Sequence, residues 1–267
     1  MTMEEILWKH ILSVRQKSPL VHNITNFVVM NNTANALLAV GASPIMAHAL
    51  GEVKEMVNIS SASVINIGTL DDIWVKSMLL AAQEANTIQK PWVLDPVGAG
   101  ASSFRDETLS QLLNYHPTVI RGNASEIIAL AKVNKATTKG VDSTAASLEA
   151  LDAAKNLNKQ YGAIVCISGE TDIIIDGEKS LFIKNGHVLM TKVTGLGCSA
   201  SALIGAFIAC IENKTEAVAA AMALLAISGE IAVQESNGPG SLQINLIDKL
   251  YNITREEFIT HIKISGL

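Results

Sequence analysis

Short apolar runs alternate with longer segments of helical periodicity along most of this chain. In the first helical segment, residues 4–16, Ile6, Leu7, Ile11 and Val14 fall on one face of a helix. Brief apolar runs typical of buried strands follow at intervals. The runs predicted as strands are residues 20–22, 43–46, 63–67, 91–94, 118–120 and 163–167.

Helical segments are predicted between these strands. The first is capped by Thr25 or Asn26 and ends at Val40, before Gly41. Repeated strand–helix alternation favours an α/β fold, with a mostly parallel central sheet and helices on both faces. No linker or low-complexity tract divides the sequence, so we expect a single domain over residues 1–267. The other predicted helices are 52–60, 71 or 72 to about 88, 104–113, 124–131 and 145–161.

The pattern changes after residue 168. Three antiparallel strands are predicted at 172–176, 180–184 and 187–190, with turns at Asp176-Gly177 and Asn185-Gly186. Four helices then follow a glycine-rich loop. They are predicted at 198–211, 215–235, 242–251 and 255–264.

The composition is unusually apolar for the charge that the chain carries. Apolar residues make up 49% of the 267 residues, charged residues 17% and aromatic residues 4%, and the mean hydropathy is +0.31. One interpretation is that apolar surface is buried between subunits as well as within one. An alanine-rich core that raises the index explains the composition equally well.

Charge and cysteine content limit the classes of binding partner and the cellular compartment that we expect for this protein. The net charge is −5 without a Lys/Arg cluster, which argues against nucleic acid. The two most apolar stretches, 200–211 and 217–227, are too short to span a membrane and predict buried helices. The first residues lack the layout of a signal peptide. Three cysteines without CxxC spacing predict reduced thiols in the cytoplasm.

Several chemically capable residues stand at the ends of predicted strands. They are Gly68, Asp95, Arg121, Ser168 and Gly195. In parallel α/β sheets, ligands bind beyond the carboxyl ends of the strands. We therefore expect these five residues to line one cleft.

The segment Gly195-Leu196-Gly197-Cys198-Ser199-Ala200 opens a predicted helix. Amides at such a helix start have no carbonyl partner, and the helix dipole adds positive potential, so the loop can hold a phosphate or an oxyanion. Three other interpretations remain. The loop also matches a dinucleotide-binding pattern, Cys198 could be a nucleophile, or a plain turn could precede a buried cysteine.

Asp95, Arg121 and Glu126 add charged groups to the same edge. Two carboxylates beside an anion site fit a magnesium–nucleotide site, and a guanidinium fits a phosphate. Each residue also has a purely structural explanation. Asp95 precedes Pro96 in a turn, Arg121 could be a surface residue, and Glu126 has the spacing of a capping box with Asn123.

These segments together resemble the hydroxyethylthiazole kinase family, within the larger ribokinase-like group. The resemblance covers nearly the whole chain, with its motifs in order. The motifs are His22-Asn23-Ile24-Thr25-Asn26, Gly41-Ala42-Ser43-Pro44-Ile45-Met46, Leu94-Asp95-Pro96-Val97-Gly98-Ala99, Arg121-Gly122-Asn123-Ala124-Ser125-Glu126 and Gly195-Leu196-Gly197-Cys198-Ser199.

The resemblance implies ATP-dependent phosphorylation of the hydroxyl of 4-methyl-5-(2-hydroxyethyl)thiazole in thiamine salvage. It also implies a ribokinase-like sheet without a separate lid domain, and a homotrimer with active sites at subunit boundaries. By position, it implies thiazole contacts at Met46 and Gly195, with Asn26 and Gly68 as further candidates. It places ATP near Arg121, Ser168 and Gly197, and Mg²⁺ near Asp95 and Glu126.

Cys198 stands where most ribokinase-like enzymes carry the aspartate that acts as general base. A helix N-terminus lowers a thiol pKa, but a nearby triphosphate raises it. We therefore hypothesise that Cys198 is a weak base, or mainly orients the substrate hydroxyl. Phosphoryl transfer tolerates this, because it depends more on positioning and charge neutralisation than on deprotonation.

Three rival functions remain open from the sequence. A hydroxymethylpyrimidine or sugar kinase would use the same anion site, although such relatives normally keep the aspartate. A cysteine hydrolase or acyltransferase would use Cys198 as a nucleophile and would not need Mg²⁺. A nucleotide-binding regulator would have lost catalysis altogether.

Overall fold

A sheet of nine strands forms the centre of the computed structural model, which describes residues 1–133 and 143–266. The strand order is β2-β1-β3-β4-β5-β6-β7-β8-β9. Strands β1 to β6 are parallel, and β7 to β9 continue the sheet antiparallel. The strands are β1 (Leu20–Ile24), β2 (Ser43–Ile45), β3 (Ala62–Asn66), β4 (Trp92–Asp95), β5 (Val119–Asn123), β6 (Ile164–Ser168), β7 (Asp172–Asp176), β8 (Lys179–Ile183) and β9 (Ile264–Gly266).

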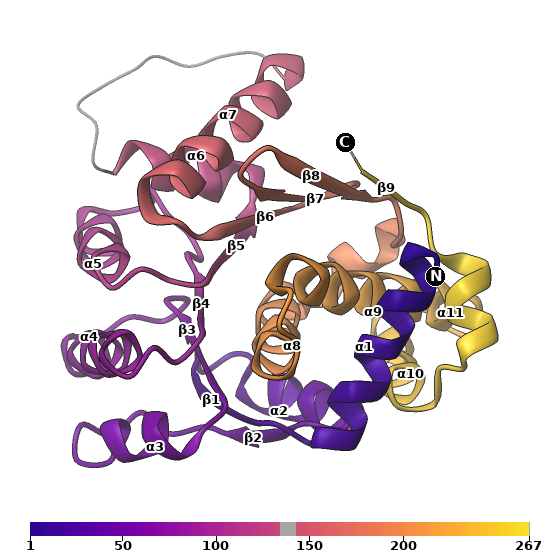
Figure 1. The fold of residues 1–267 in the computed structure, drawn as a ribbon, viewed down its shortest axis with the longest axis horizontal. Helices are drawn as coiled ribbons and strands as arrows, with labels where there is room; N and C mark the ends of the chain where they lie inside the picture. The colour runs from indigo at the N-terminus through magenta and orange to yellow at the C-terminus, as the bar shows by residue number, and fades with distance from the viewer. Residues whose placement is uncertain (134–142, 267) are drawn as a thin grey trace.

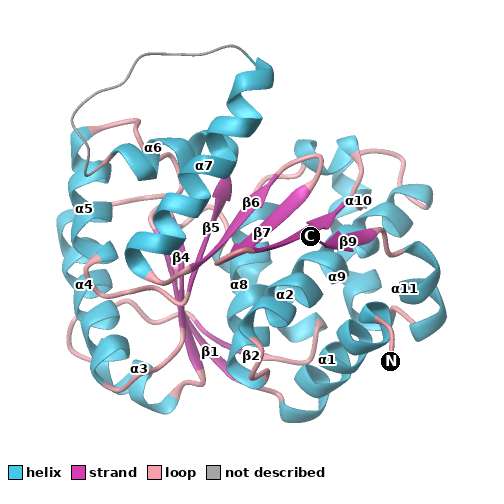
Figure 2. Cartoon of the chain, turned by 45° about the horizontal axis from the view of Figure 1, so that its top comes forward, coloured by secondary structure: helices cyan, strands magenta, loops and turns pink. Residues whose placement is uncertain are grey.

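Helices cover both faces of this sheet (Figures 1 and 2). One core contains residues of α3 to α7, and the other contains residues of α1, α2 and α8 to α11. The helices are α1 (Met3–Lys17), α2 (Met30–Ala39), α3 (Val53–Ile59), α4 (Asp72–Thr87), α5 (Ser103–Leu113), α6 (Ala124–Lys132), α7 (Ser143–Tyr161), α8 (Leu196–Cys210), α9 (Lys214–Gln234), α10 (Pro239–Asn252) and α11 (Arg255–His261), with a short 3₁₀ helix, η1 (Val188–Lys192).

The central strands are apolar on both sides because each side faces a helical layer. In β3, Val64 belongs to one core and Ile65 to the other, which gives the nearly continuous apolar run typical of a buried parallel strand. The predicted fold class is confirmed, and the described residues contain no separate lid domain.

Helix α9 is apolar almost all round. Within the described residues it is the one helix long and apolar enough to cross a membrane by length and composition, but 83% of that window is buried inside the fold. It packs against α1, α8 and α10. Its environment is therefore that of a core helix.

Three predicted elements differ from the structure. The strand predicted at 187–190 is wrong. Gly186, at φ +118°, turns the chain away from the sheet, and the His187 ring caps the Leu189 amide at 3.1 Å to start η1. The free edge of β8 is taken instead by β9, so the last predicted helix ends at His261. The helix expected after Thr25 or Asn26 begins only at Met30.

Candidate functional site

The candidate site lies where four parallel strands end beside the start of α8. Strands β3 and β4 pair in register, so Asn66 lies opposite Asp95. Strands β5 and β6 likewise place Asn123 opposite Ser168. Parallel strands all end at one edge of the sheet, and this edge gathers most of the residues predicted for the site.

Asn66 is the centre of a hydrogen-bond network that sequence reasoning missed. Its Oδ1 accepts from the Asn26 side-chain amide at 2.9 Å and from the Gly68 backbone amide at 2.9 Å. Its Nδ2 donates to Asp95 Oδ2 at 2.6 Å. The Asn26 amide also donates to Cys198 Sγ at 3.4 Å. Asn66 therefore links the thiol to the carboxylate.

Asp95 is buried beneath this edge with one oxygen held and one free. Oδ2 also accepts from the Ser201 hydroxyl at 2.8 Å, while Oδ1 has no hydrogen-bond partner within the described residues. Burial raises the pKa of Asp95 to about 6, against the lowering effect of Arg121 and its hydrogen bonds. We call Asn26, Asn66, Asp95, Cys198 and Ser201 the strand-end network.

Cys198 lies in the first turn of α8. This helix begins at Gly195, at φ +82°, where a Cβ would come within 2.5 Å of Val29. Within the described residues, no side chain accepts a hydrogen bond from the first backbone amides of α8. These amides can therefore bind an anion. Burial and the Asp95 charge raise the pKa of the Cys198 thiol. Both effects favour the neutral form of the thiol.

Arg121 and Ser168 lie on the other side of the same helix start. Arg121 Nη2 donates to Ser168 Oγ at 2.6 Å. A Cβ on Gly197 would come within 2.6 Å of Arg121 Nη1, so only glycine lets the guanidinium lie against α8. Arg121 Nε is buried without a hydrogen-bond partner among the described residues. Arg121 also lines a cavity, described below, where its guanidinium can meet an anion.

Glu126 has the structural role that its spacing predicted. It forms a capping box with Asn123. Its Oε2 accepts a hydrogen bond from the backbone amide of Asn123 at 2.9 Å, and its Oε1 accepts one from the backbone amide of Gly98 at 3.0 Å. Both oxygens are therefore used by the backbone, and each keeps a lone pair for a water molecule.

The acidic groups of the site are too few to hold a magnesium ion by themselves, but they could hold one together with phosphates and water. No group of three His, Cys, Asp or Glu side chains that could hold a metal occurs in the described part of the chain. Magnesium typically uses one or two carboxylates together with substrate phosphates and water. The free Oδ1 of Asp95 fits such a ligand, and Glu126 fits through water.

Gly68 and Arg105 fix the loops around the network. A Cβ on Gly68 would come within 2.6 Å of the Asn26 amide, so glycine there allows Asn26 to reach Asn66. Arg105, another residue that sequence reasoning missed, donates to the carbonyls of Ile67 at 2.6 Å, Val97 at 2.8 Å and Gly68 at 3.0 Å. It joins the loops after β3 and β4.

A cavity of about 790 Å³ opens beside Arg121 and Ser168. Its lining combines polar groups, among them Arg121, Ser168 and Asp172, with apolar side chains of α9, namely Met222, Leu225 and Ala226. Residues 185–191, which we call the cavity loop, contribute both kinds. A ligand with a charged part and a flat apolar part, such as a nucleotide, matches this mixed lining.

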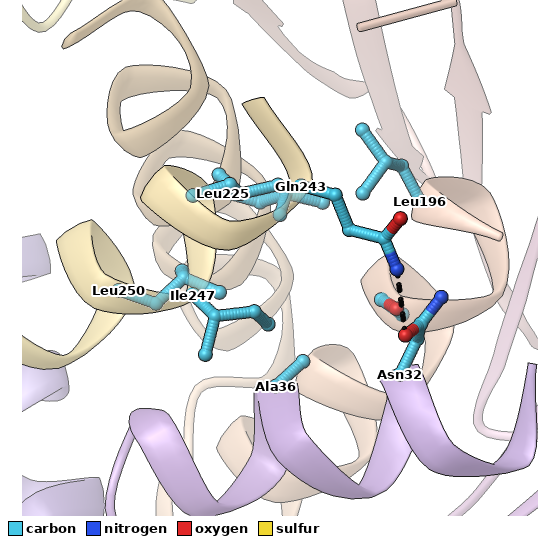
Figure 3. Close-up of a pocket in the computed structure, with 9 residues that line it drawn as sticks. Asn32, Ala36, Leu196, Leu225, Gln243, Ile247 and Leu250 are labelled. Atoms are coloured by element: carbon cyan, nitrogen blue, oxygen red, sulfur yellow. Dashed lines mark hydrogen bonds between the residues drawn. The ribbon is translucent and has the colours of Figure 1, made fainter. Parts of the chain in front are cut away.

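A second void, next to the first, is very small. Leu196 and Leu225 line both spaces. The void measures about 10 Å³, and Gln243 donates to Asn32 at 2.8 Å across it (Figure 3). Such a volume holds one water molecule at most, so this void is a packing defect between α2, α8 and α10.

Met46 lies on the loop after the edge strand β2, which neighbours β1, the strand that leads to Asn26. The buried His22 ring contacts the Ala47 carbonyl at 2.7 Å and so fixes the loop that carries Met46. On the same loop, the His48 ring lies 4.5 Å from the Trp74 ring. Burial lowers the pKa of His22. The single chain thus brings together Asn26, Gly68, Asp95, Arg121, Glu126, Ser168, Gly195, Gly197 and Cys198 at the ends of the parallel strands, with Met46 on the loop beyond β2.

Known proteins resemble this chain over almost its whole length. The sequence model of the hydroxyethylthiazole kinase family matches residues 11–256. A hydroxyethylthiazole kinase of Syntrophus aciditrophicus is 55% identical over 261 residues, covering 97% of each chain. One from Vibrio parahaemolyticus is 52% identical over 265 residues, covering 99% of each chain.

Solved structures agree with this match. The hydroxyethylthiazole kinase protein of Pyrococcus horikoshii OT3 superposes with a TM-score of 0.91 at 41% identity, covering 98% of this chain and 99% of that one. A pyridoxal kinase of Staphylococcus aureus has a TM-score of 0.66 at 15% identity, covering 93% and 97%. At that identity, the second similarity concerns the fold alone.

Proposed function

The chain belongs to the hydroxyethylthiazole kinase family, and from that premise we propose how its residues share the reaction. It is a kinase with a ribokinase-like fold that phosphorylates the hydroxyl of 4-methyl-5-(2-hydroxyethyl)thiazole in thiamine salvage. The observation that carries the assignment of residues is the strand-end network. It joins the Cys198 thiol to the Asp95 carboxylate, which has one oxygen without a hydrogen bond, beside a cavity large enough for a nucleotide.

We propose that ATP binds in the 790 Å³ cavity, with its phosphates toward α8. Arg121 offers donors beside the Ser168 hydroxyl, and Gly197 allows close approach to the first amides of α8. These groups would neutralise charge on the transferred phosphoryl group, which is the main requirement of phosphoryl transfer.

We propose that Mg²⁺ is held by Asp95 Oδ1 and, through water, by Glu126. When bound, the ion would neutralise negative charge on the phosphates. The protein's own contribution is to fix Asp95. Asn66 and Ser201 donate hydrogen bonds to Oδ2. These bonds fix the orientation of the carboxylate, and with it the position of Oδ1.

We propose that the thiazole alcohol binds on the Cys198 side of the network. The neutral thiol, held by Asn26, would orient the hydroxyl, accept its hydrogen bond and act at most as a weak base. Gly195 and Gly68 allow Val29 and Asn26 to pack closely against the loops on this side of the network. Met46 is proposed as a further contact to the thiazole.

A homotrimer with active sites at subunit boundaries would explain an exposed apolar patch beside the site, where Phe27 directly follows Asn26. The patch contains Phe27, Val28 and Ile73, whose exposed fractions are 62%, 63% and 62%. The Phe27 and Trp74 rings lie 4.6 Å apart. Large exposed apolar patches typically mark interfaces, so Phe27→Asp should dissociate the assembly in light-scattering measurements.

We infer one domain and a cytoplasmic location. Every described strand joins a single sheet, which supports one folding unit. Cys166, Cys198 and Cys210 are free thiols in the described part of the chain. Reduced cysteines are typical of the cytoplasm.

The decisive experiment is an ATP-consumption assay with the thiazole alcohol, hydroxymethylpyrimidine and ribose, each with and without Mg²⁺. We expect consumption that requires both Mg²⁺ and the thiazole alcohol. Faster turnover with hydroxymethylpyrimidine would reassign the acceptor. Mg²⁺-independent acyl transfer to Cys198 would replace the kinase mechanism altogether.

A further inference from the structure

We propose that Glu230 and Asn185 form a clamp that sets the position of the cavity loop and thereby the affinity for the nucleotide. Neither residue would be catalytic; both are positioning residues. The inference rests on the proposed function in one respect, namely that the 790 Å³ cavity holds the nucleotide.

The cavity loop has no regular partner of its own in the sheet. It follows β8, turns at Gly186 with φ +118°, and continues into η1 rather than into a strand. Asn185, Gly186, His187, Val188, Met190 and Thr191 of this loop line the cavity. Something outside the loop must therefore fix its position relative to the rest of the cavity wall.

Glu230, on α9, supplies that fixation. Its Oε2 accepts from Asn185 Nδ2 at 2.9 Å, and its Oε1 accepts from the Gly186 amide at 3.1 Å. Lys263 Nζ lies 3.0 Å from Oε1 and completes an ion pair. One carboxylate thus holds two consecutive residues at the base of the loop.

Asn185 is the second half of the clamp. Its Nδ2 also donates to the His261 carbonyl at 2.8 Å, and its Oδ1 accepts the Lys263 amide at 2.8 Å. Both donors and the acceptor of this amide are therefore used. Although Asn185 lines the cavity, its side chain is engaged in fixing the loop and is not available to recognise a base.

A second contact to α9 lies one residue before Glu230. Met190 of the cavity loop packs so closely on Gly229 that a Cβ there would overlap its Sδ and Cε atoms. The loop is therefore held to α9 at its base by hydrogen bonds and further along by packing. These two contacts are chemically independent.

A further part of the cavity wall belongs to the same helix. Met222, Leu225 and Ala226 line it, and Ala226 lies four residues before Glu230, on the same helical face. One rigid element thus provides part of the wall and holds the loop that lines another part. None of the residues that hold the loop belongs to the strand-end network.

The test is nucleotide affinity in Glu230→Ala and Glu230→Gln. We expect Glu230→Ala to raise KM for ATP and Kd for ADP about tenfold, because two hydrogen bonds to a carboxylate are lost. The values of kcat and of KM for the thiazole alcohol should stay within twofold. Glu230→Gln, which keeps an acceptor for Gly186, should lie between the alanine variant and the wild type.

Glu216→Ala is the matched control. Glu216 lies on the same helix, and its side chain is 23% exposed against 15% for Glu230, but it pairs with His10 at 2.8 Å, far from the cavity loop. We expect a similar loss of thermal stability and unchanged nucleotide affinity. Equal affinity in Glu230→Ala and Glu216→Ala would overturn the proposal and leave Glu230 a stabilising residue only.

ADP binding by calorimetry separates this proposal from the proposed function. It needs neither the thiazole nor turnover. Wild-type protein that binds ADP without phosphorylating the thiazole alcohol would contradict the proposed function and leave the clamp testable. Wild-type activity with unaltered ADP binding in Glu230→Ala would contradict the clamp alone.

Discussion

The two ends of the cleft are built in different ways. The strand-end network consists of side chains that leave adjacent parallel strands and the start of α8, and that hydrogen-bond to one another. The cavity loop is an irregular segment held from a distance by α9. The first end is fixed by the topology of the sheet, whereas the second is fixed by a few specific contacts.

This difference suggests a division of labour. Groups that must be held to a fraction of an ångström during phosphoryl transfer lie where strand register already determines their position. Groups that only need to enclose the nucleotide lie on a segment whose position one side chain can adjust. Substitutions in the strand-end network should therefore lower kcat, and substitutions around the cavity loop should raise KM for ATP. The following variants test that separation.

Asp95→Asn should have the largest effect. The amide can still accept from Asn66 and Ser201, but it removes the charge that would face Mg²⁺ and phosphate. We expect kcat to fall on the order of 10³-fold, with KM for ATP changed far less. Steady-state kinetics over a Mg²⁺ series measures this, and Asp71→Asn, at the start of α4, is the control. A loss confined to KM would remove the distinction between the two ends.

Asn66→Ala should have the next largest effect. It removes one of the two hydrogen bonds to Asp95 Oδ2 and one of the two made by the Asn26 side-chain amide, so that Asp95 keeps only Ser201 and Asn26 keeps only Cys198. We expect a loss of about 10- to 100-fold in kcat, typical of groups that orient a metal-facing ligand. The Mg²⁺ concentration that gives half-maximal activity should rise as well.

Asn23→Ala is the control for Asn66→Ala. Asn23 is also buried at the end of a parallel strand, β1, but its amide donates only to the Val21 carbonyl, at 3.0 Å. We expect its kcat to stay within about twofold of wild type. Equal losses in the two variants would mean that Asn66 serves folding rather than positioning.

Cys198→Ala should have a smaller effect, about tenfold in kcat, because phosphoryl transfer depends little on deprotonating the alcohol. Cys198→Asp should remain active, since a carboxylate can also accept the hydroxyl proton. Rates from single-turnover kinetics measure the chemical step directly. A folded, ATP-binding Cys198→Asp variant without activity would count against the base role of this position.

Asp172→Asn should have the smallest effect on kcat among these variants. Its effect should instead be on the free energy of unfolding, and that effect should depend on pH. Asp172 lines the cavity, and burial raises its pKa from 3.8 to about 6. A raised folded-state pKa stabilises the protein below pH 3.8, and that contribution is lost as the pH rises through 6. The variant lacks this loss, so its advantage over wild type should grow by about 2 kcal/mol between pH 4 and pH 7.

Urea unfolding of both proteins at pH 4, 5, 6 and 7 gives that difference directly. Asp95, whose pKa is also about 6, titrates in both proteins and cancels in the comparison. A difference in stability that is independent of pH would show that Asp172 is ionised throughout this range in the native state.

The strand ends could be predicted from sequence because each follows a local rule. A parallel strand ends in a glycine or a polar residue, and a helix begins beyond it. This rule located Gly68, Asp95, Arg121 and Ser168 without any knowledge of their contacts, whereas Gly195 follows η1 and not a strand. It also predicted the capping box of Glu126, which depends only on residues three apart.

The same rule could not find Asn66 or the clamp. Asn66 lies inside an otherwise apolar run, and its partners Asn26 and Asp95 are 40 and 29 residues away. The cavity loop was mistaken for a strand because its alternation of side chains resembles one. What decides its structure is Glu230, 45 residues after Asn185. Contacts at such separations leave no periodic signal, although a polar side chain within a buried strand is a clue worth following.

The burial of α9 also has a consequence for biosynthesis. This 21-residue helix leaves the ribosome before α10, which covers part of it. Until α10 has been synthesised, the nascent protein exposes a long apolar surface to which chaperones or other unfinished chains can bind. Premature termination within α10 should therefore produce insoluble protein rather than a shortened enzyme, and yield in the soluble fraction of cell extracts would report it.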